Sequence, residues 1–192
     1  MSTDSYQLKP GTVLDERYRI EKTIGEGGFG ITYLGVSLHQ GGKVAIKEFF
    51  WKSYMSRDQF GTSQVFLSRE EDRKDYEHQM KRFLREARII REFAGEPGIV
   101  QVRDCFEENK TAYIVMEFLE GQTLKQYLSE GKTMEPERAF RLLLPLMETL
   151  KKVHGYGMIH RDISPDNIMV NESGTLTLID FGAARDYWKL DE

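Results

Sequence analysis

A glycine-rich hexapeptide is the first segment whose residue types could do chemistry. Gly25-Glu26-Gly27-Gly28-Phe29-Gly30 fits the pattern G-x-G-x-x-G, whose missing side chains let a backbone approach phosphate oxygens closely. Alone, the pattern fits equally well a tight turn that binds nothing. The residues that follow, ITYLGVS, are β-branched and aromatic, so a strand comes next and not the helix of a dinucleotide-binding fold. We therefore expect a hairpin loop that lies over phosphates.

Two later segments gather ionisable and amide groups. The octapeptide His160-Arg161-Asp162-Ile163-Ser164-Pro165-Asp166-Asn167 specifies eight positions, and Asp180-Phe181-Gly182 places an acid directly after an apolar run. The tripeptide alone is a common accident, whereas the octapeptide is not. Strand-like residues 168–170 and 176–179 flank Asn171-Glu172-Ser173-Gly174, which indicates a short hairpin that brings the two segments together.

A lysine within an apolar strand is the third candidate. Lys47 ends the run Val44-Ala45-Ile46-Lys47, and by default such a lysine alternates outward to solvent. It has a further role only if an acidic partner exists, and Glu86, in a segment of helical periodicity, is the candidate. Because arginines flank Glu86, an ordinary surface pair remains the alternative.

The elements that must position these residues fall into two groups. The first group is rich in strands, and three of them are expected to form an antiparallel meander: Tyr18–Ile24, Ile31–Ser37 and Lys43–Phe50. Residues 51–68 show no period and are interpreted as an irregular insertion. Ser68 and Glu71 are typical of a capping box, and the helix that follows shows apolar spacing from Tyr76 to Ala94.

The second group is mainly helical and follows two further strands. Those strands are expected at Ile99–Phe106 and Thr111–Met116, and the helices at Thr123–Leu128 and Pro136–His154, the latter kinked at Pro145. A small β-rich lobe joined to a helical lobe near residues 117–121 is the organisation that this order predicts.

Composition excludes several classes of protein. The 192 residues carry a net charge of −4, which gives no reason to expect nucleic-acid binding or attraction to an anionic membrane. Cys105 is the single cysteine, so no internal disulfide can form, and we expect it in the core. No apolar stretch is long enough to span a bilayer, and the first residues lack a secretory signal. We expect a soluble, cytoplasmic protein without a membrane segment.

Six segments, taken in order, resemble the eukaryotic-type Ser/Thr protein kinases of the bacterial branch. They are GEGGFGITY, VAIK, Glu86, VMEFLEG, HRDISPDN and DFGAAR, and the resemblance covers about Leu14 to Arg185. It implies an α+β, protein-kinase-like fold with a small antiparallel β lobe and a mainly helical lobe that is truncated after DFG. The implied division is an N-terminal arm 1–13, an N-lobe 14–116, a hinge 117–121 and a partial C-lobe 122–192.

The resemblance also implies a reaction, namely phosphoryl transfer from ATP, with Mg²⁺, to Ser/Thr hydroxyls of a protein substrate. Lys47, fixed by Glu86, would hold the α- and β-phosphates, and Asp162 would orient the acceptor hydroxyl and take its proton. Asn167 and Asp180 would hold magnesium. The implied nucleotide-binding residues are Ile24, Gly25, Gly27, Gly30, Thr32, Ala45, Lys47, Met116, Glu117, Leu119, Met169 and Asp180. An apolar stack of Ile90, Val102, His160 and Phe181 is implied as well.

Three departures from the family pattern bear on activity. Ser164 stands where such kinases carry a lysine, so charge neutralisation in the transition state should be weaker unless another cation substitutes. Thr32 replaces the usual valine over the adenine. The chain also ends ten residues after Gly182, so we expect the helix 136–154 to have an unfinished apolar face, open to a partner or to self-association.

Two other functions stay open on the sequence. An ATP-binding pseudokinase or regulatory module without catalysis is favoured by Ser164 and the missing substrate platform. A small-molecule kinase of the antibiotic-phosphorylating type is the other, and the contexts of Arg161 and Phe181 favour the protein-kinase branch over it.

Overall fold

The chain forms two compact units. The structure, a computed structural model, describes residues 6–28, 30–58, 62–129 and 135–186. One unit comprises Met1–Ala87 with Val102–Phe118, and the other comprises Arg88–Gln101 with Leu119–Glu192. The third passage of the chain from one unit to the other, after Phe118, falls within the segment expected as a hinge, whereas residues 88–101 cluster with the second unit and not with the first.

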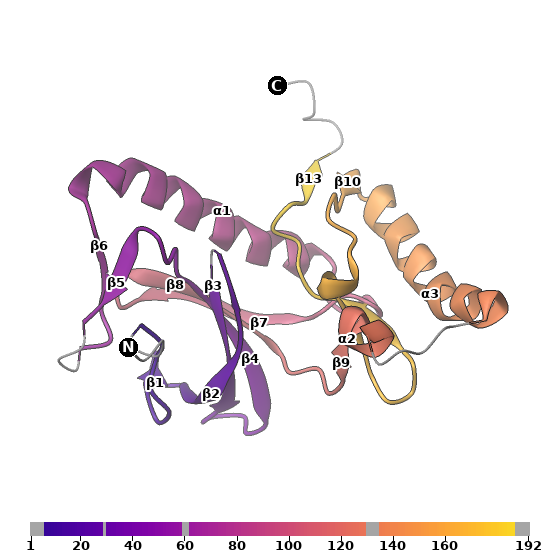
Figure 1. Cartoon of the computed structure of the whole chain (residues 1–192), viewed down its shortest axis with the longest axis horizontal. Coiled ribbons are helices and arrows are strands. Elements are labelled where there is room, and N and C mark those ends of the chain that lie inside the picture. The colour runs from indigo at the N-terminus through magenta and orange to yellow at the C-terminus, as the bar shows by residue number, and fades with distance from the viewer. Residues whose placement is uncertain (1–5, 29, 59–61, 130–134, 187–192) are drawn as a thin grey trace. The chain divides into compact units, whose positions relative to one another are not determined.

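The first unit contains a six-stranded antiparallel sheet in the order β1-β2-β3-β4-β8-β7 (Figure 1). Its strands are β1 Val13–Leu14, β2 Tyr18–Gly27, β3 Gly30–Ser37, β4 Lys43–Phe49, β7 Val102–Glu108 and β8 Thr111–Glu117. The meander expected from the first three long strands is confirmed as β2-β3-β4. The turn between β7 and β8 has Asn109 and Lys110 at φ 53° and 58°, as in the primed turns whose twist matches a hairpin.

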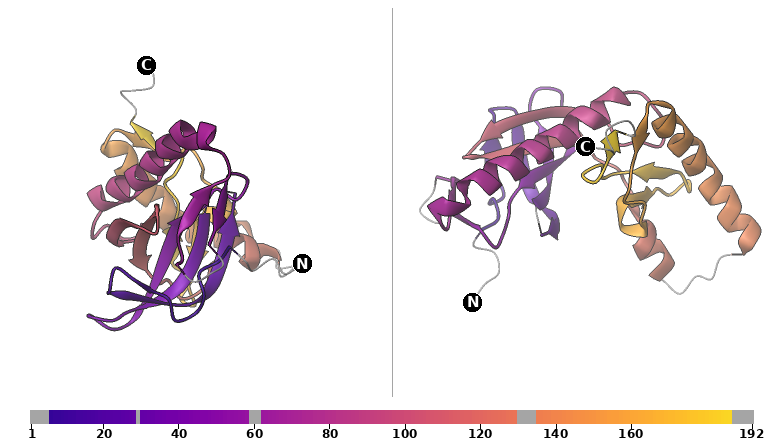
Figure 2. Two further views of the ribbon diagram at one scale, coloured as in Figure 1. Left: turned by 90° about the vertical axis from the view of Figure 1, so that its left-hand side faces the viewer. Right: turned by 90° about the horizontal axis from the view of Figure 1, so that it is seen from above.

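Strand alternation gives this sheet two different faces. Ile31 and Tyr33 of β3 are buried while their neighbours are only half-buried. On one face, Phe49 packs against Tyr76 and Phe83 of helix α1 (Arg73–Glu92), with ring centroids 5.6 and 5.7 Å apart. Figure 2 shows α1 lying along the sheet on this side. The opposite face carries Tyr33, Ile46 and Glu48, all fully buried.

The described part of the insertion, residues 51–58 and 62–68, contains two strands, which corrects the expectation of irregular structure. Strands β5 (Met55–Arg57) and β6 (Val65–Leu67) pair as an antiparallel hairpin. The expected capping box at Ser68 is also wrong: a 3-10 turn, Glu70–Asp72, precedes α1, and its N-cap residue is Arg69, without a side-chain cap. Ser68 instead donates its N–H to the carbonyl of Tyr54. Each strand of the hairpin is only three residues long, too short for its alternation to be visible.

The second unit combines two further helices with short strands. Its elements are β9 Gln122–Thr123, α2 Leu124–Ser129, α3 Pro136–Gly155, β10 Met158–Ile159, a 3-10 turn Pro165–Asn167, β11 Ile168–Val170, β12 Leu176–Leu178 and β13 Arg185–Asp186. The expected hairpin is present as β11-β12, and α3 runs on through Pro145. Gly98 and Val100 extend the pairing, because they exchange backbone hydrogen bonds with Leu178.

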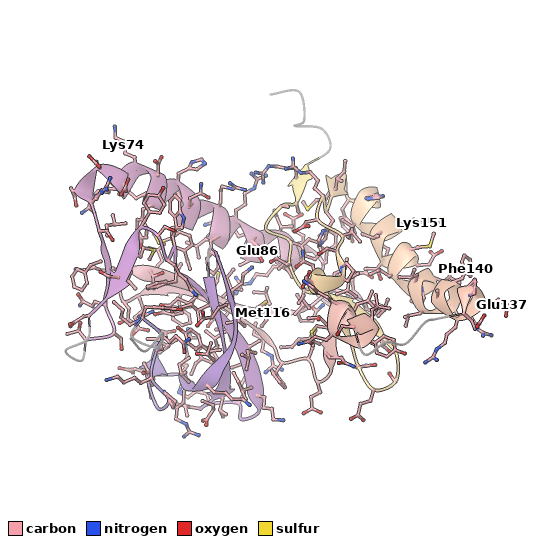
Figure 3. All side chains as sticks on the ribbon, viewed as in Figure 1. Lys74, Glu86, Met116, Glu137, Phe140 and Lys151 are labelled. Carbon is pink, nitrogen blue, oxygen red and sulfur yellow. The ribbon has the colours of Figure 1, made fainter. Side chains whose placement is uncertain are left out.

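Three side chains illustrate which parts of the two units are buried and which are exposed to solvent. Phe93 packs edge-on against Tyr156, with centroids 5.3 Å apart, and anchors the core of the second unit. Phe140 on α3 is 60% exposed (Figure 3). Cys105 is half-buried, not in the core as expected. Among the described residues, no helix is both long enough and apolar enough to cross a membrane.

Candidate active site

The glycines of the loop between β2 and β3 differ in what surrounds them. A Cβ built on Gly30 would lie 2.8 Å from the carbonyl oxygen of Glu48, so the packing of β3 on β4 requires glycine there. A Cβ on Gly27 or Gly28 would meet nothing within 4 Å, and one on Gly25 would make only an ordinary contact with Thr32. Gly25, Gly27 and Gly28 do not have a positive φ. The fold of this unit therefore does not explain glycine at the loop tip, which is consistent with a ligand that approaches the backbone.

Lys47 and Glu86 form the expected ion pair. Lys47 Nζ lies 2.8 Å from Glu86 Oε1, and the two side chains are 21% and 5% exposed. The pair forms because Glu86 is on the buried face of α1, three residues after Phe83 and one before Ala87. Lys47 also lies over the ring of Phe83, at 5.9 Å from its centroid. Figure 3 labels Glu86. The result is a cation held in place beside an apolar surface, where a second anion could bind it.

The remaining candidates of the first unit are aligned with this lysine by strand register. Thr32 lies opposite Lys47, and Gly25 lies opposite Thr32, so one row crosses three strands. Two residues before Lys47 in β4, Ala45 lies opposite Met116. Because residues two apart in a strand share a face, as do paired residues of neighbouring strands, both rows lie on the same side of the sheet. Ile24 is 44% exposed, and Glu117 is half-buried at the end of β8.

Asp162 and Asn167 lie together in the second unit. The amide nitrogen of Asn167 donates to Asp162 Oδ2 at 2.9 Å and to the Asp162 carbonyl at 3.1 Å. The local turn that brings them together has the N–H of Asn167 donating to the Ser164 carbonyl at 3.0 Å. Both side-chain bonds use the nitrogen of Asn167, so its amide oxygen is not engaged in them. Arg161, just before Asp162, has φ 67°, a strained conformation of the kind that clusters at functional sites.

Asp180 reaches the same region through the hairpin. The N–H of Ile179 donates to the carbonyl of Asn167, which places the residue before Asp180 beside the end of the octapeptide 160–167. Asp180 Oδ1 accepts the N–H of Gly182 at 2.8 Å. The structure thus brings Asp162, Asn167 and Asp180 onto adjoining turns of one unit.

His160 is buried beside them. Its ring meets that of Phe181 edge-on, with centroids 4.6 Å apart, and its Nδ1 accepts the N–H of Asp162 at 3.4 Å. Burial lowers the pKa of His160, although the charges of Asp180 and Asp162 and the Asp180 backbone oppose the shift. Nε2 has no partner of hydrogen-bond geometry in the described part of the chain. These contacts fit the packing role expected of His160 and Phe181 in the apolar stack.

The donor set fits magnesium better than a transition metal. Within the described residues, no three His, Cys, Asp or Glu side chains converge on a point. Magnesium does not need such a cage, since it keeps waters and takes one or two carboxylates together with substrate phosphates. The Asp180 carboxylate and the Asn167 amide oxygen are hard oxygen ligands of that kind. The residues present therefore fit a Mg²⁺ that arrives with a phosphate ligand.

Two features of this region lie outside the motifs. Lys125 of α2 contacts Asp166 of the octapeptide, with Nζ 3.0 Å from Oδ2, both largely exposed. Glu26 of the glycine loop is bonded to residues near the N-terminus. Neither shows periodicity or a family signature, so no sequence signal could have found them. Met169, in β11 opposite Thr123, and Leu119, just after β8, are half-buried, and Phe29 lies outside the described residues.

This combination of sheet, helix and acidic loops defines a protein kinase domain. The protein kinase domain family matches residues 18–191, so the chain belongs to that family. It is 34% identical over 93% of its length to the "Probable serine/threonine-protein kinase PknB" of Lactococcus lactis, and 36% identical over 90% to the serine/threonine-protein kinase Pkn2 of Myxococcus xanthus. The solved structure of PpkA-294 in its apo form matches 93% of the chain with a TM-score of 0.83 and 35% identity.

The expected family and fold class are thereby confirmed. The chain spans 25% and 19% of the length of those two curated relatives, and 62% of the solved chain. The activity of a whole kinase is therefore a proposal for this chain, and so are the roles of the individual residues.

Proposed function

We propose that this protein transfers the γ-phosphoryl group of ATP, with Mg²⁺, to Ser or Thr hydroxyls of a protein substrate. Family membership supports the reaction class. The single observation that carries the proposal is the ion pair of Lys47 with Glu86, whose Nζ and Oε1 atoms are 2.8 Å apart. Lys47 lies in register with Thr32, which in turn lies opposite Gly25. A fixed ammonium aligned with a side-chain-free loop is what phosphate binding requires.

The proposed roles in the second unit follow from its hydrogen bonds. The bond from Asn167 to Asp162 Oδ2 orients the carboxylate, and Oδ1 is then the oxygen that would accept the proton of the substrate hydroxyl. Asn167 and Asp180 are the proposed magnesium ligands, and the ion would supply positive charge against the phosphates. Because this chemistry needs positioning and charge stabilisation more than covalent catalysis, the orientation of Asp162 matters more than its basicity.

Ser164 leaves one role without its usual residue. A hydroxyl donates a single hydrogen bond and brings no positive charge, so we propose a slower transfer than in a kinase with lysine there. The groups proposed to bind ATP, namely Lys47 and the two magnesium ligands, are all present. The ATP-binding alternative without catalysis therefore differs from the main proposal only in the transfer step.

The experiment measures binding and transfer separately on the full chain. Mg-ATP at a hundredfold its dissociation constant should stabilise the protein by about 2.7 kcal/mol in thermal unfolding. Transfer of radiolabelled phosphate to a generic Ser/Thr protein substrate should be lost in Asp162→Asn. Glu172→Gln, which removes an exposed charge in the nearby β11–β12 turn, is the control and should keep wild-type transfer. Stabilisation without transfer in the wild type would leave only the binding role. The absence of both stabilisation and transfer would overturn the proposal.

A further inference from the structure

Glu26 is the polar residue of the glycine-rich hexapeptide, and three side chains converge on its carboxylate. Its carboxylate accepts the hydroxyl of Tyr6 at 3.0 Å, the amide of Gln7, and the ammonium of Lys52 at 2.5 Å. Lys52 also lies over the ring of Tyr6, at 4.7 Å from its centroid. We refer to Tyr6, Gln7, Glu26 and Lys52 as the Glu26 cluster. It joins the N-terminal arm, the glycine loop and the insertion after β4.

The arm's end of the cluster is itself firmly anchored. Arg57 Nε donates to the Tyr6 carbonyl at 2.6 Å, and the Tyr6 ring stacks on Phe50 at 5.6 Å. The N–H of Leu8 donates to the hydroxyl of Tyr33 at 3.1 Å, and Leu8 is 3% exposed. Because these three contacts fix the arm to the rest of the first unit, the arm can restrain the residues that it contacts.

The loop's end, in contrast, has few side-chain contacts of its own, and beyond the Glu26 cluster it is restrained by the backbone pairing of β2 with β3, which runs to Gly27 and Gly30. Gly27 and Gly28 have open space where a side chain would be, and Gly25 makes only a loose contact. Glycine has the greatest backbone freedom of any residue, so the end of a hairpin of this composition samples more conformations when side-chain contacts are removed. Gln7 adds a second attachment, because its amide oxygen accepts a hydrogen bond from the hydroxyl of Thr23 at 2.7 Å. Thr23 lies in β2, two residues before Gly25.

The cluster is charged under ordinary conditions. The hydrogen bond from Lys52, joined by those from Tyr6 and Gln7, lowers the pKa of Glu26, and the bond to Glu26 raises the pKa of Lys52. Both groups therefore remain ionised near neutral pH, and three donors meet one carboxylate.

We propose that the Glu26 cluster is a tether by which the N-terminal arm and Lys52 hold the glycine-rich loop in its nucleotide-binding position. Tyr6, Gln7, Glu26 and Lys52 are positioning residues, which act on the ligand only through the loop. The inference rests on the proposed function, since it takes the loop to bind ATP phosphates. A tethered loop loses less conformational entropy on binding, so the tether should lower the dissociation constant of Mg-ATP.

The test begins with a measurement that needs no nucleotide. Hydrogen exchange of the peptide covering residues 25–30 should be faster in Glu26→Gln and in Tyr6→Phe, which keeps the ring on Phe50, than in the wild type. The matched control is Glu21→Gln, on the same strand and in an exposed ion pair with Arg19 at 2.8 Å. Exchange that is equally fast in Glu26→Gln and Glu21→Gln would overturn the tether.

Titration calorimetry with Mg-ATP then tests the consequence for binding. Glu26→Gln should weaken binding about fivefold, the scale of one ordinary hydrogen bond, and Glu21→Gln should leave it unchanged. Glu26→Gln combined with Lys52→Gln should be no weaker than the worse single variant, because the pair acts as a unit. Faster exchange without weaker binding, or tighter binding, would overturn the positioning role. If the wild type itself binds no Mg-ATP, the proposed function fails, while the exchange data still decide the tether.

Discussion

Two neighbouring residues of β4 each form an ion pair, and the two pairs lie on opposite faces of one sheet. Lys47 pairs with Glu86 and keeps 21% of its side chain exposed. Glu48 pairs with Arg57 at 2.6 Å, and the two side chains are 0% and 4% exposed. The first pair has access to solvent and hence to a ligand, whereas the second has none. The difference in burial therefore separates the pair that we propose as a binding group from the pair that can only be structural.

The hydrogen bonds around the second pair explain why it can stay buried. Glu48 accepts the hydroxyls of Tyr33 at 2.8 Å and Tyr113 at 3.0 Å besides both contacts from Arg57. Burial raises the pKa of Glu48, while Arg57 and the two tyrosines oppose the rise. Burial alone would lower the pKa of Arg57, but the charge of Glu48, its hydrogen bonds with Arg57 and the two tyrosines together outweigh burial, and the pKa is raised. Arg57 thus fixes the β5–β6 hairpin and the arm to the sheet.

Breaking the buried pair should have the largest effect on stability. Arg57→Met leaves Glu48 as an uncompensated buried charge, so the free energy of unfolding should fall by about 3–5 kcal/mol. Urea denaturation followed by circular dichroism measures it. Arg19→Met, which removes an exposed pair with Glu21, is the control and should cost less than about 1 kcal/mol. Equal losses in the two variants would show that burial is not what distinguishes them.

Breaking the open pair should affect the reaction more than the fold. Lys47→Met should reduce phosphoryl transfer at least about a hundredfold, the scale for removing one charge-stabilising donor. The unfolding free energy should fall by only about 1–2 kcal/mol, because the Lys47 side chain is 21% exposed and water can enter where its ammonium was. Transfer rates per folded molecule and urea denaturation separate the two effects. Wild-type transfer in Lys47→Met would remove this pair from the proposed site.

The same contrast shows what sequence reasoning could reach. The three long strands of the meander were predictable, because β-branched and aromatic residues recur between glycine turns. The Lys47–Glu86 pair could be anticipated from a family resemblance. The short strands β5 and β6 could not, since three residues each show no period. Ser68 and Glu71 fit a capping pattern, yet the hairpin that ends at Leu67 holds Ser68 outside the helix.

Glu48 shows the limit most clearly. Strand alternation indicates only that Glu48 faces away from Lys47, and an acidic residue facing away from a ligand site is normally in solvent. Its burial depends on Arg57 and on the arm, both distant in sequence and without periodicity. The roles of the site residues themselves stay predictions until they are measured.

The glycine loop offers a milder way to sharpen the comparison. Gly30→Ala would push a Cβ against the Glu48 carbonyl, so the free energy of unfolding should fall by about 1–3 kcal/mol. Gly27→Ala meets open space and should be neutral or stabilising by up to about 1 kcal/mol, because it reduces the freedom of the unfolded chain. For Gly27→Ala, thermal unfolding should therefore show no loss of stability, whereas Mg-ATP calorimetry should show weaker binding. Equal destabilisation by both changes would contradict this distinction.

The pH dependence of stability that His160 causes is the smallest effect that we expect. His160 is a buried titratable group, and its Nε2 has no hydrogen-bond partner among the described residues. Burial lowers its pKa, so between that pKa and the ordinary 6.5 the unfolded chain binds more protons than the folded one. Stability should therefore be fully present above pH 6.5 and decline as the pH falls below it, with a slope of at most about 1.4 kcal/mol per pH unit for one proton. His160→Gln should flatten this slope in denaturation series from pH 7.5 to about pH 5. His154→Gln, an exposed histidine on α3, should not, and an unchanged slope in His160→Gln would contradict the assignment.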